Sequence, residues 1–102
     1  MILYYVAYQN VTMDTSQATI VALGALEHIA ADDDLLRRFM AETGVEPTTL
    51  GEAAAEPAFL AGVLDFLLSD EPALLAYCEA ASLSPELPMR ARRALPGSPM
   101  EE

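Results

Sequence analysis

Apolar residues along the chain recur mostly at the spacing of an α-helix. Residues 16–31 and 35–43 each place apolar side chains three and four positions apart, which lays them on one face of a helix. From Phe59 to Leu68 the apolar run leaves almost no polar stripe, and a helix that is apolar nearly all round is typical of the centre of a protein. The pattern predicts an all-α protein with a central helix that begins at Pro57.

Capping residues indicate where the predicted helices begin and end. Gln17 and Glu52 lie three residues after Asp14 and Thr49, the spacing of a capping box, so helices are expected near 16–31 and from Thr49 to about Glu56. Gly44 follows the second helix, where glycine adopts the left-handed conformation that ends many helices. The candidate helix starts are Asp14, Thr15 or Ser16, the Asp32-Asp33-Asp34 triplet, Thr49, Pro57, Asp70 and Ser84-Pro85.

A shift of 38 residues without gaps aligns residues 21–47 with residues 59–85. The matches fall on core, cap and stop positions of a helix-turn-helix hairpin, although unrelated Ala/Leu-rich hairpins would also look alike. Whether the two segments are a true repeat or only similar hairpins, the pattern predicts one domain over residues 14–95. This domain is a compact bundle of five to six short helices built from two related helical hairpins. The identical pairs are Gly24/Gly62, Leu26/Leu64, Asp32/Asp70, Leu36/Leu74 and Pro47/Pro85.

The two ends of the chain differ from this helical domain. Residues 1–13 are rich in Tyr, Val and Ile and have strand propensity. We expect them to form an irregular arm or to pair with another copy, unless the natural protein starts at Met13 and residues 1–12 lie outside it. Residues 96–102 are expected to be a flexible tail. The start of the chain lacks the features of a signal peptide, and the lone Cys78 cannot form an internal disulfide, so we expect a cytoplasmic protein.

The chain is strongly acidic, which narrows the choice of partner. Sixteen acidic residues stand against five arginines and no lysine, for a net charge of −11 at pH 7. A field of this sign repels a phosphate backbone, so we expect a protein partner with a neutral or basic surface, or a homodimer. Asp65 interrupts the densest apolar run, and no membrane span is expected. Glu27 and Asp65 could act as paired carboxylates, but without a cleft signal we interpret them as solvated.

The residue types that carry most enzyme chemistry are scarce. His28 is the only histidine and aligns with Phe66, which indicates a partly buried structural side chain. Cys78 aligns with Met40 and is interpreted as an inert buried thiol. One His and one Cys cannot complete a zinc site, and the aspartates at 32–34 fit helix capping better than a calcium loop. We therefore expect no enzyme activity, no catalytic residue, no cofactor and no metal site.

One segment is similar to a DNA-binding helix-turn-helix. A Gly44-Val45 turn precedes a Thr-capped helix over residues 48–56, but that helix carries glutamates and no Lys or Arg, and carboxylates there would face phosphates. A nucleic-acid-binding regulator is thus the alternative function. The only cations that could support it are Arg37, Arg38, Arg90, Arg92 and Arg93, the last three also being expected to complement a helix dipole.

A non-catalytic protein–protein interaction or adaptor module is the function that these patterns favour. A small bundle with a groove between two hairpins can accept an amphipathic helix of a partner. Large apolar residues would make the contact, although each is also a natural core residue. The candidate partner-contact residues are Phe39, Met40, Phe59, Phe66 and Tyr77.

Two stretches carry a resemblance to a known family. RFMAETGVEP, residues 38–47, and FLAGVLDFLLSDEPALLAYC, residues 59–78, are similar to those of a small alphaproteobacterial family of unknown function, and the resemblance covers roughly residues 14–97. It implies a bacterial, cytoplasmic, all-helical protein. It supplies no catalytic residues.

Overall fold

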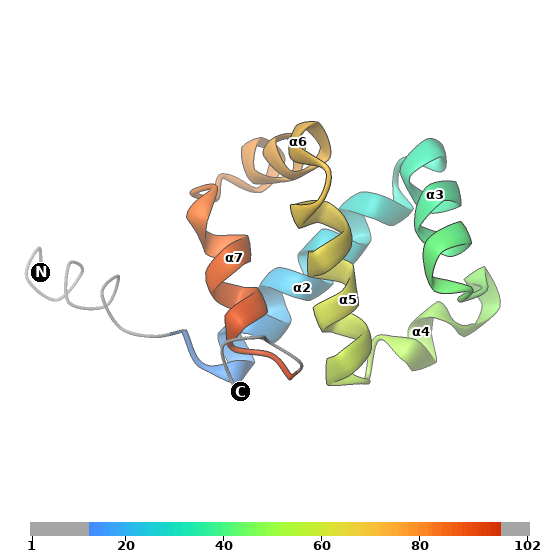
Figure 1. Cartoon of the computed structure of the whole chain (residues 1–102), viewed down its shortest axis with the longest axis horizontal. Coiled ribbons are helices and arrows are strands. Elements are labelled where there is room, and N and C mark those ends of the chain that lie inside the picture. Colours follow the sequence, from blue (N-terminus) through green and yellow to red (C-terminus); the bar gives the residue numbers. More distant parts are fainter. Residues whose placement is uncertain (1–12, 97–102) are drawn as a thin grey trace, which may run out of the picture.

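The computed structural model describes residues 13–96, and within this range it consists of helices and turns with no strand (Figure 1). The predicted all-α class is therefore confirmed for the described residues. Most of the N-terminal arm and of the C-terminal tail lies outside them. The helices are α2 (Thr15–Ala30), α3 (Asp33–Thr43), the 3-10 helix η1 (Pro47–Thr49), α4 (Leu50–Ala53), α5 (Pro57–Leu68), α6 (Glu71–Ala81) and α7 (Glu86–Arg93).

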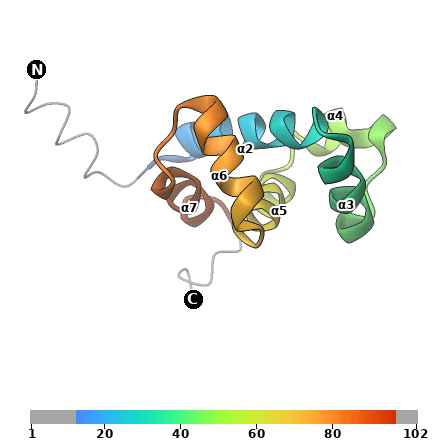
Figure 2. The ribbon, with the colours of Figure 1, turned by 90° about the horizontal axis from the view of Figure 1, so that it is seen from above.

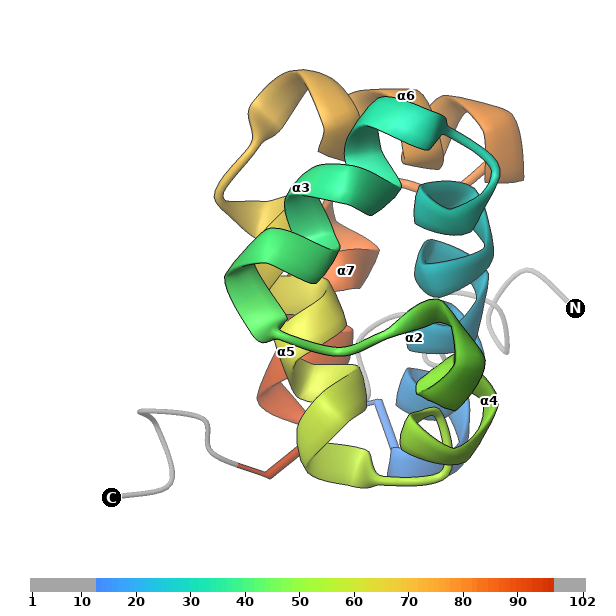
Figure 3. The same ribbon diagram turned by 90° about the vertical axis from the view of Figure 1, so that its right-hand side faces the viewer.

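Three helices form the centre of the bundle. α2 packs against α5 and α7, and α5 packs against α7. α3 follows α2 as the second helix of one hairpin and α6 follows α5 as the second helix of the other. Figures 1 and 2 show α6 across one end of the bundle and α3 at the side away from α7, and Figure 3 turns this side toward the viewer, with α3 and α4 in front. The two predicted hairpins thus pack on each other through α2 and α5.

The second helices of the two hairpins have matching borders. α3 and α6 each contain eleven residues, and their starts lie 38 positions apart. Asp32 caps α3 by accepting from the amides of Asp34 and Leu35, and Asp70 caps α6 by accepting from the amide of Ala73. Both helices end at a left-handed residue, Gly44 with φ of 76° and Ser82 with φ of 57°. The borders coincide at the offset found in the sequence.

Other borders test the capping predictions. The capping box of Asp14 and Gln17 is confirmed, with bonds of 2.8 and 3.2 Å between each side chain and the other residue's amide. The helix predicted from Thr49 to about Glu56 is present but shorter: α4 runs only from Leu50 to Ala53, with Thr49 at its N-cap position but without the capping hydrogen bond. The Thr49 hydroxyl donates to the carbonyl of Glu46 at 3.0 Å, and the Thr49 backbone, with φ of −108° and ψ of 4°, is outside the extended region that N-cap residues usually adopt.

α2 has a row of buried alanines on one face and two exposed large apolar residues on another. Ala18, Ala22 and Ala25 have no exposed surface, whereas Ile20 is 70% exposed and Leu23 is 37% exposed. Alanines at this spacing line one face of α2, and the lack of bulk on that face permits α5 and α7 to pack closely against it. Of the larger apolar residues of α2, Ile20 and Leu23 face outward, while Leu26 and Ile29 are buried in the core.

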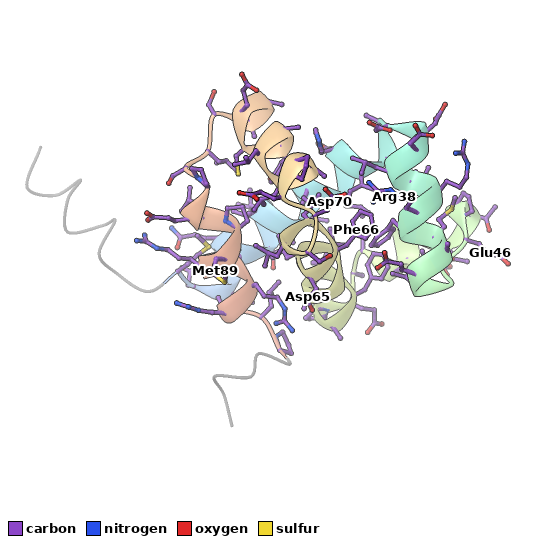
Figure 4. All side chains as sticks on the ribbon, turned by 45° about the horizontal axis from the view of Figure 1, so that its top comes forward. Arg38, Glu46, Asp65, Phe66, Asp70 and Met89 are labelled. Carbon is purple, nitrogen blue, oxygen red and sulfur yellow. The ribbon has the colours of Figure 1, made fainter. Side chains whose placement is uncertain are left out.

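Two ion pairs join helices that are distant in sequence. Arg38 of α3 donates from Nη2 to Asp70 Oδ2 at 2.8 Å, and its guanidinium carbon lies 5.7 Å from the ring centroid of Phe66 (Figure 4). Arg92 of α7 donates from Nε to Asp65 Oδ1 at 2.7 Å. These pairs attach α3 to the start of α6, and α7 to α5.

Candidate functional site

The predicted contact residues lie mainly inside the protein. Phe39, Phe66 and Tyr77 are buried, with 0%, 5% and 4% of their surface exposed, while Met40 and Phe59 are half-buried. The ring of Phe39 meets the rings of Phe59 and Phe66 edge-on, at centroid distances of 5.7 and 5.3 Å. In this conformation a partner cannot reach the rings of Phe39 and Phe66, whereas Tyr77 borders a depression that is open to solvent, and the set as a whole stays a prediction. Large aromatic residues gain most by burial in the core.

A shallow depression of about 300 Å³ lies between α2 and α6, open to solvent. Tyr77 builds its floor by reaching from α6 to α2, where its hydroxyl donates to the carbonyl oxygen of Val21 at 2.8 Å. The Tyr77 ring lies 5.6 Å from the imidazole ring of His28, measured between centroids. The lining residues are Gly24, Glu27, His28, Tyr77, Ala80 and Ala81.

Gly24 leaves the space that Tyr77 occupies. A Cβ atom at position 24 would lie 2.7 Å from the Tyr77 hydroxyl oxygen, a distance at which one of the two must move. Gly62, the residue aligned with Gly24, has nothing within 4 Å of the same point. The glycine is thus required sterically at only one of the two aligned positions.

One carboxylate stands at the depression. Glu27 is exposed and belongs to the lining, whereas Glu79 lies about 160° around α6 from Tyr77. Neither α2 nor α6 contains a lysine or an arginine. Burial raises the pKa of the Tyr77 hydroxyl, with smaller contributions in the same direction from Cys78 and Glu27. The hydroxyl therefore stays protonated, and its proton is held by Val21.

The thiol on α6 lies apart from the depression. Cys78 is buried and does not belong to the lining, and its sulfur lies 4.0 Å from the carbonyl oxygen of Ser84. Burial raises its pKa, so the nucleophilic thiolate is disfavoured. This agrees with the interpretation of Cys78 as a core thiol. Within residues 13–96, no three His, Cys, Asp or Glu side chains are placed to hold a metal ion.

An apolar strip on α2 continues from the depression. Ile20 lies one helical turn before Gly24, and Leu23 one turn before Glu27, so these four residues share the outer face of the helix. Sequence reasoning missed Ile20 and Leu23 because it searched for large aromatic residues. The sequence did contain a usable signal, the row of alanines at helical spacing. If these alanines are buried, the opposite face of α2, which carries Ile20 and Leu23, must be exposed.

The remaining charged candidates have structural partners. The predicted capping role of the aspartate triplet is confirmed at Asp32. Asp65, expected to be only solvated, accepts from Arg92. Arg90, Arg92 and Arg93 occupy the last turn of α7, as expected for cations that complement a helix dipole.

The chain belongs to the family described as "Protein of unknown function (DUF3572)", whose model matches residues 15–98. This confirms the resemblance seen in the sequence, while bacterial origin stays a prediction. No curated protein and no solved structure matches the chain. Among the described residues, no helix has the length and apolar character that crossing a membrane requires.

Proposed function

We propose that this member of a family of unknown function is a non-catalytic protein-interaction module, acting in the cytoplasm. The observation that carries the proposal is the outer face of α2, where Ile20 and Leu23 are exposed beside the depression while alanines fill the core side. Exposed apolar side chains that adjoin one another and have a polar rim are typical of protein-binding surfaces.

The non-catalytic part of the proposal is supported by the chemistry of the depression. A reaction site needs a nucleophile or an acid–base pair in mutual reach, in a space that excludes water. Here the depression is open, and the Tyr77 hydroxyl is bound to the backbone of α2. Glu27 and His28 remain as polar groups on the rim, where they suit recognition of a partner.

Charge favours a protein partner over nucleic acid. The net charge is −11, and Arg37, Arg38, Arg90 and Arg92 each contact a carboxylate. The segment similar to a recognition helix is only the four-residue α4, which at 1.5 Å per residue is roughly 6 Å long. In a fluorescence anisotropy titration with mixed duplex DNA at low salt we expect no binding. Binding that weakens steeply with salt would favour the regulator instead.

Site-specific photo-crosslinking tests the module directly. A photoreactive amino acid is placed at Ile20 or at Leu75, an apolar residue of α6 that is 45% exposed and does not line the depression. After irradiation in the native cell, we expect a discrete crosslinked product from position 20 and none from position 75. Equal products from both positions, or no product from either, would contradict an interaction through α2.

A further inference from the structure

We propose that the outer face of α2 and the adjoining end of α6 bind a basic amphipathic helix of a partner protein. One apolar side chain of that helix enters the depression over Tyr77, and its lysines or arginines meet Glu27 and the acidic field of the chain. The inference rests on the proposed interaction function and names the chemistry of the partner.

The shape of this face fits a helix. Ile20, Leu23, Gly24 and Glu27 follow the i, i+3, i+4, i+7 pattern and span about 10 Å along α2, which is close to two helical turns. The hollow beside them is walled by Ala80 and Ala81. Small residues at the hollow and larger apolar residues beside it permit the close approach that helix-in-groove binding needs.

The charge of this face selects a basic partner. α2 contributes Glu27 to the lining of the depression, and neither α2 nor α6 contains a Lys or Arg, so the cations must come from the partner. The whole chain carries −11, a field that speeds the approach of a basic helix and repels an acidic one. It also opposes pairing with a second copy, because both copies carry the same charge.

Two synthetic helical peptides test the charge requirement. They share one leucine/alanine face, and their polar face carries lysine in one peptide and glutamate in the other. Binding of each to the full chain is measured by fluorescence anisotropy at near-physiological salt. We expect the lysine peptide to bind and the glutamate peptide not to bind. Equal binding of the two, or no binding of the lysine peptide, would overturn the proposal.

Three variants locate the binding site. Ile20→Glu and Leu23→Glu should each weaken binding of the lysine peptide at least about tenfold, because each removes the burial of a large aliphatic side chain. Leu75→Glu is the matched control, since it lies on α6 about 140° around the helix from Ala80. It should change the dissociation constant less than twofold. All three positions are exposed, and circular dichroism verifies that the variants fold.

The variants separate docking from general attraction between charges. Each one adds a negative charge, so non-specific attraction of a lysine peptide would stay the same or strengthen. Unchanged binding by Ile20→Glu would therefore overturn the proposal. A wild-type dimer that Ile20→Glu converts to monomer in analytical ultracentrifugation would assign the face to a second copy instead. A crosslinked partner at position 20 without lysine-peptide binding would leave the interaction function standing and refute only the basic helix.

Discussion

Replacing Gly24 and Gly62 by alanine should change stability in opposite directions. Both glycines lie inside helices, at aligned positions of the two hairpins. A Cβ atom at position 24 would lie 2.7 Å from the Tyr77 hydroxyl oxygen, whereas at position 62 it would meet nothing within 4 Å. The same chemical change therefore meets a steric conflict at one site and open space at the other.

The magnitudes follow from three contributions to the free energy of unfolding. In a helix interior, alanine is more favourable than glycine by up to about 1 kcal/mol, and Gly62→Ala should gain roughly that amount. Gly24→Ala has the same gain, but it must displace Tyr77 from the Val21 carbonyl, which costs about 1 kcal/mol for the hydrogen bond. Overpacking of the buried ring costs a further ~1–3 kcal/mol. The net expectation for Gly24→Ala is a loss of about 1–3 kcal/mol.

Urea unfolding followed by far-ultraviolet circular dichroism measures these changes. Tyr77→Phe supplies the internal control, because the next nearest atom of the ring, Cζ, lies 3.6 Å from the added Cβ, an ordinary contact. In the Tyr77→Phe background, Gly24→Ala should become neutral or stabilising. If Gly24→Ala stabilises the wild-type chain as much as Gly62→Ala does, the contact between Tyr77 and α2 is not as described.

Three further changes test the core, the surface ion pair and the thiol. Phe39→Ala should lower the free energy of unfolding by about 3–5 kcal/mol in the urea assay, since it empties a fully buried aromatic site; a loss below ~1 kcal/mol would contradict that burial. The hydrogen bond from Arg38, followed by that from the Ala73 amide, holds the pKa of Asp70 below its usual 3.8. The ion pair therefore stabilises the fold at pH values above 3.8, and this stabilisation is lost as the pH falls through the lowered pKa of Asp70. Asp70→Asn keeps a capping oxygen and should cost about 0.2–1 kcal/mol at pH 7, with no difference remaining well below pH 3.8; a pH-independent difference would refute the ion pair as its cause. The buried Cys78 thiol should react slowly with Ellman's reagent in the native chain and rapidly in urea, and equal rates would show that it is exposed.

Local interactions made most of the fold predictable from the sequence. Asp14, Asp32 and Asp70 cap helices through amides within three residues, and Gly44 ends α3 through its own backbone conformation. Each of these signals involves only residues that are close in sequence, so it can be recognised without knowing the contacts between distant segments. Thr49 makes no capping bond because its backbone, after the 3-10 turn η1, does not adopt the extended conformation of an N-cap residue, and residue spacing does not reveal that conformation.

The candidate site was less predictable because it depends on contacts between distant segments. The hydrogen bond from Tyr77 to Val21 joins residues 56 positions apart, and no periodicity in the sequence encodes that pairing. Size was also a poor guide to contact residues. Phe39 is buried, while Ile20 is exposed because α2 packs on the bundle through its alanines.

Mapping the lysine peptide onto the isotope-labelled full chain by nuclear magnetic resonance tests the proposed binding face most directly. The largest changes in amide chemical shift should fall on Ile20–His28 of α2 and Tyr77–Ala81 of α6. Changes spread over the acidic residues of α3 and α4, or concentrated on α7, would contradict the assignment of this face as the binding surface.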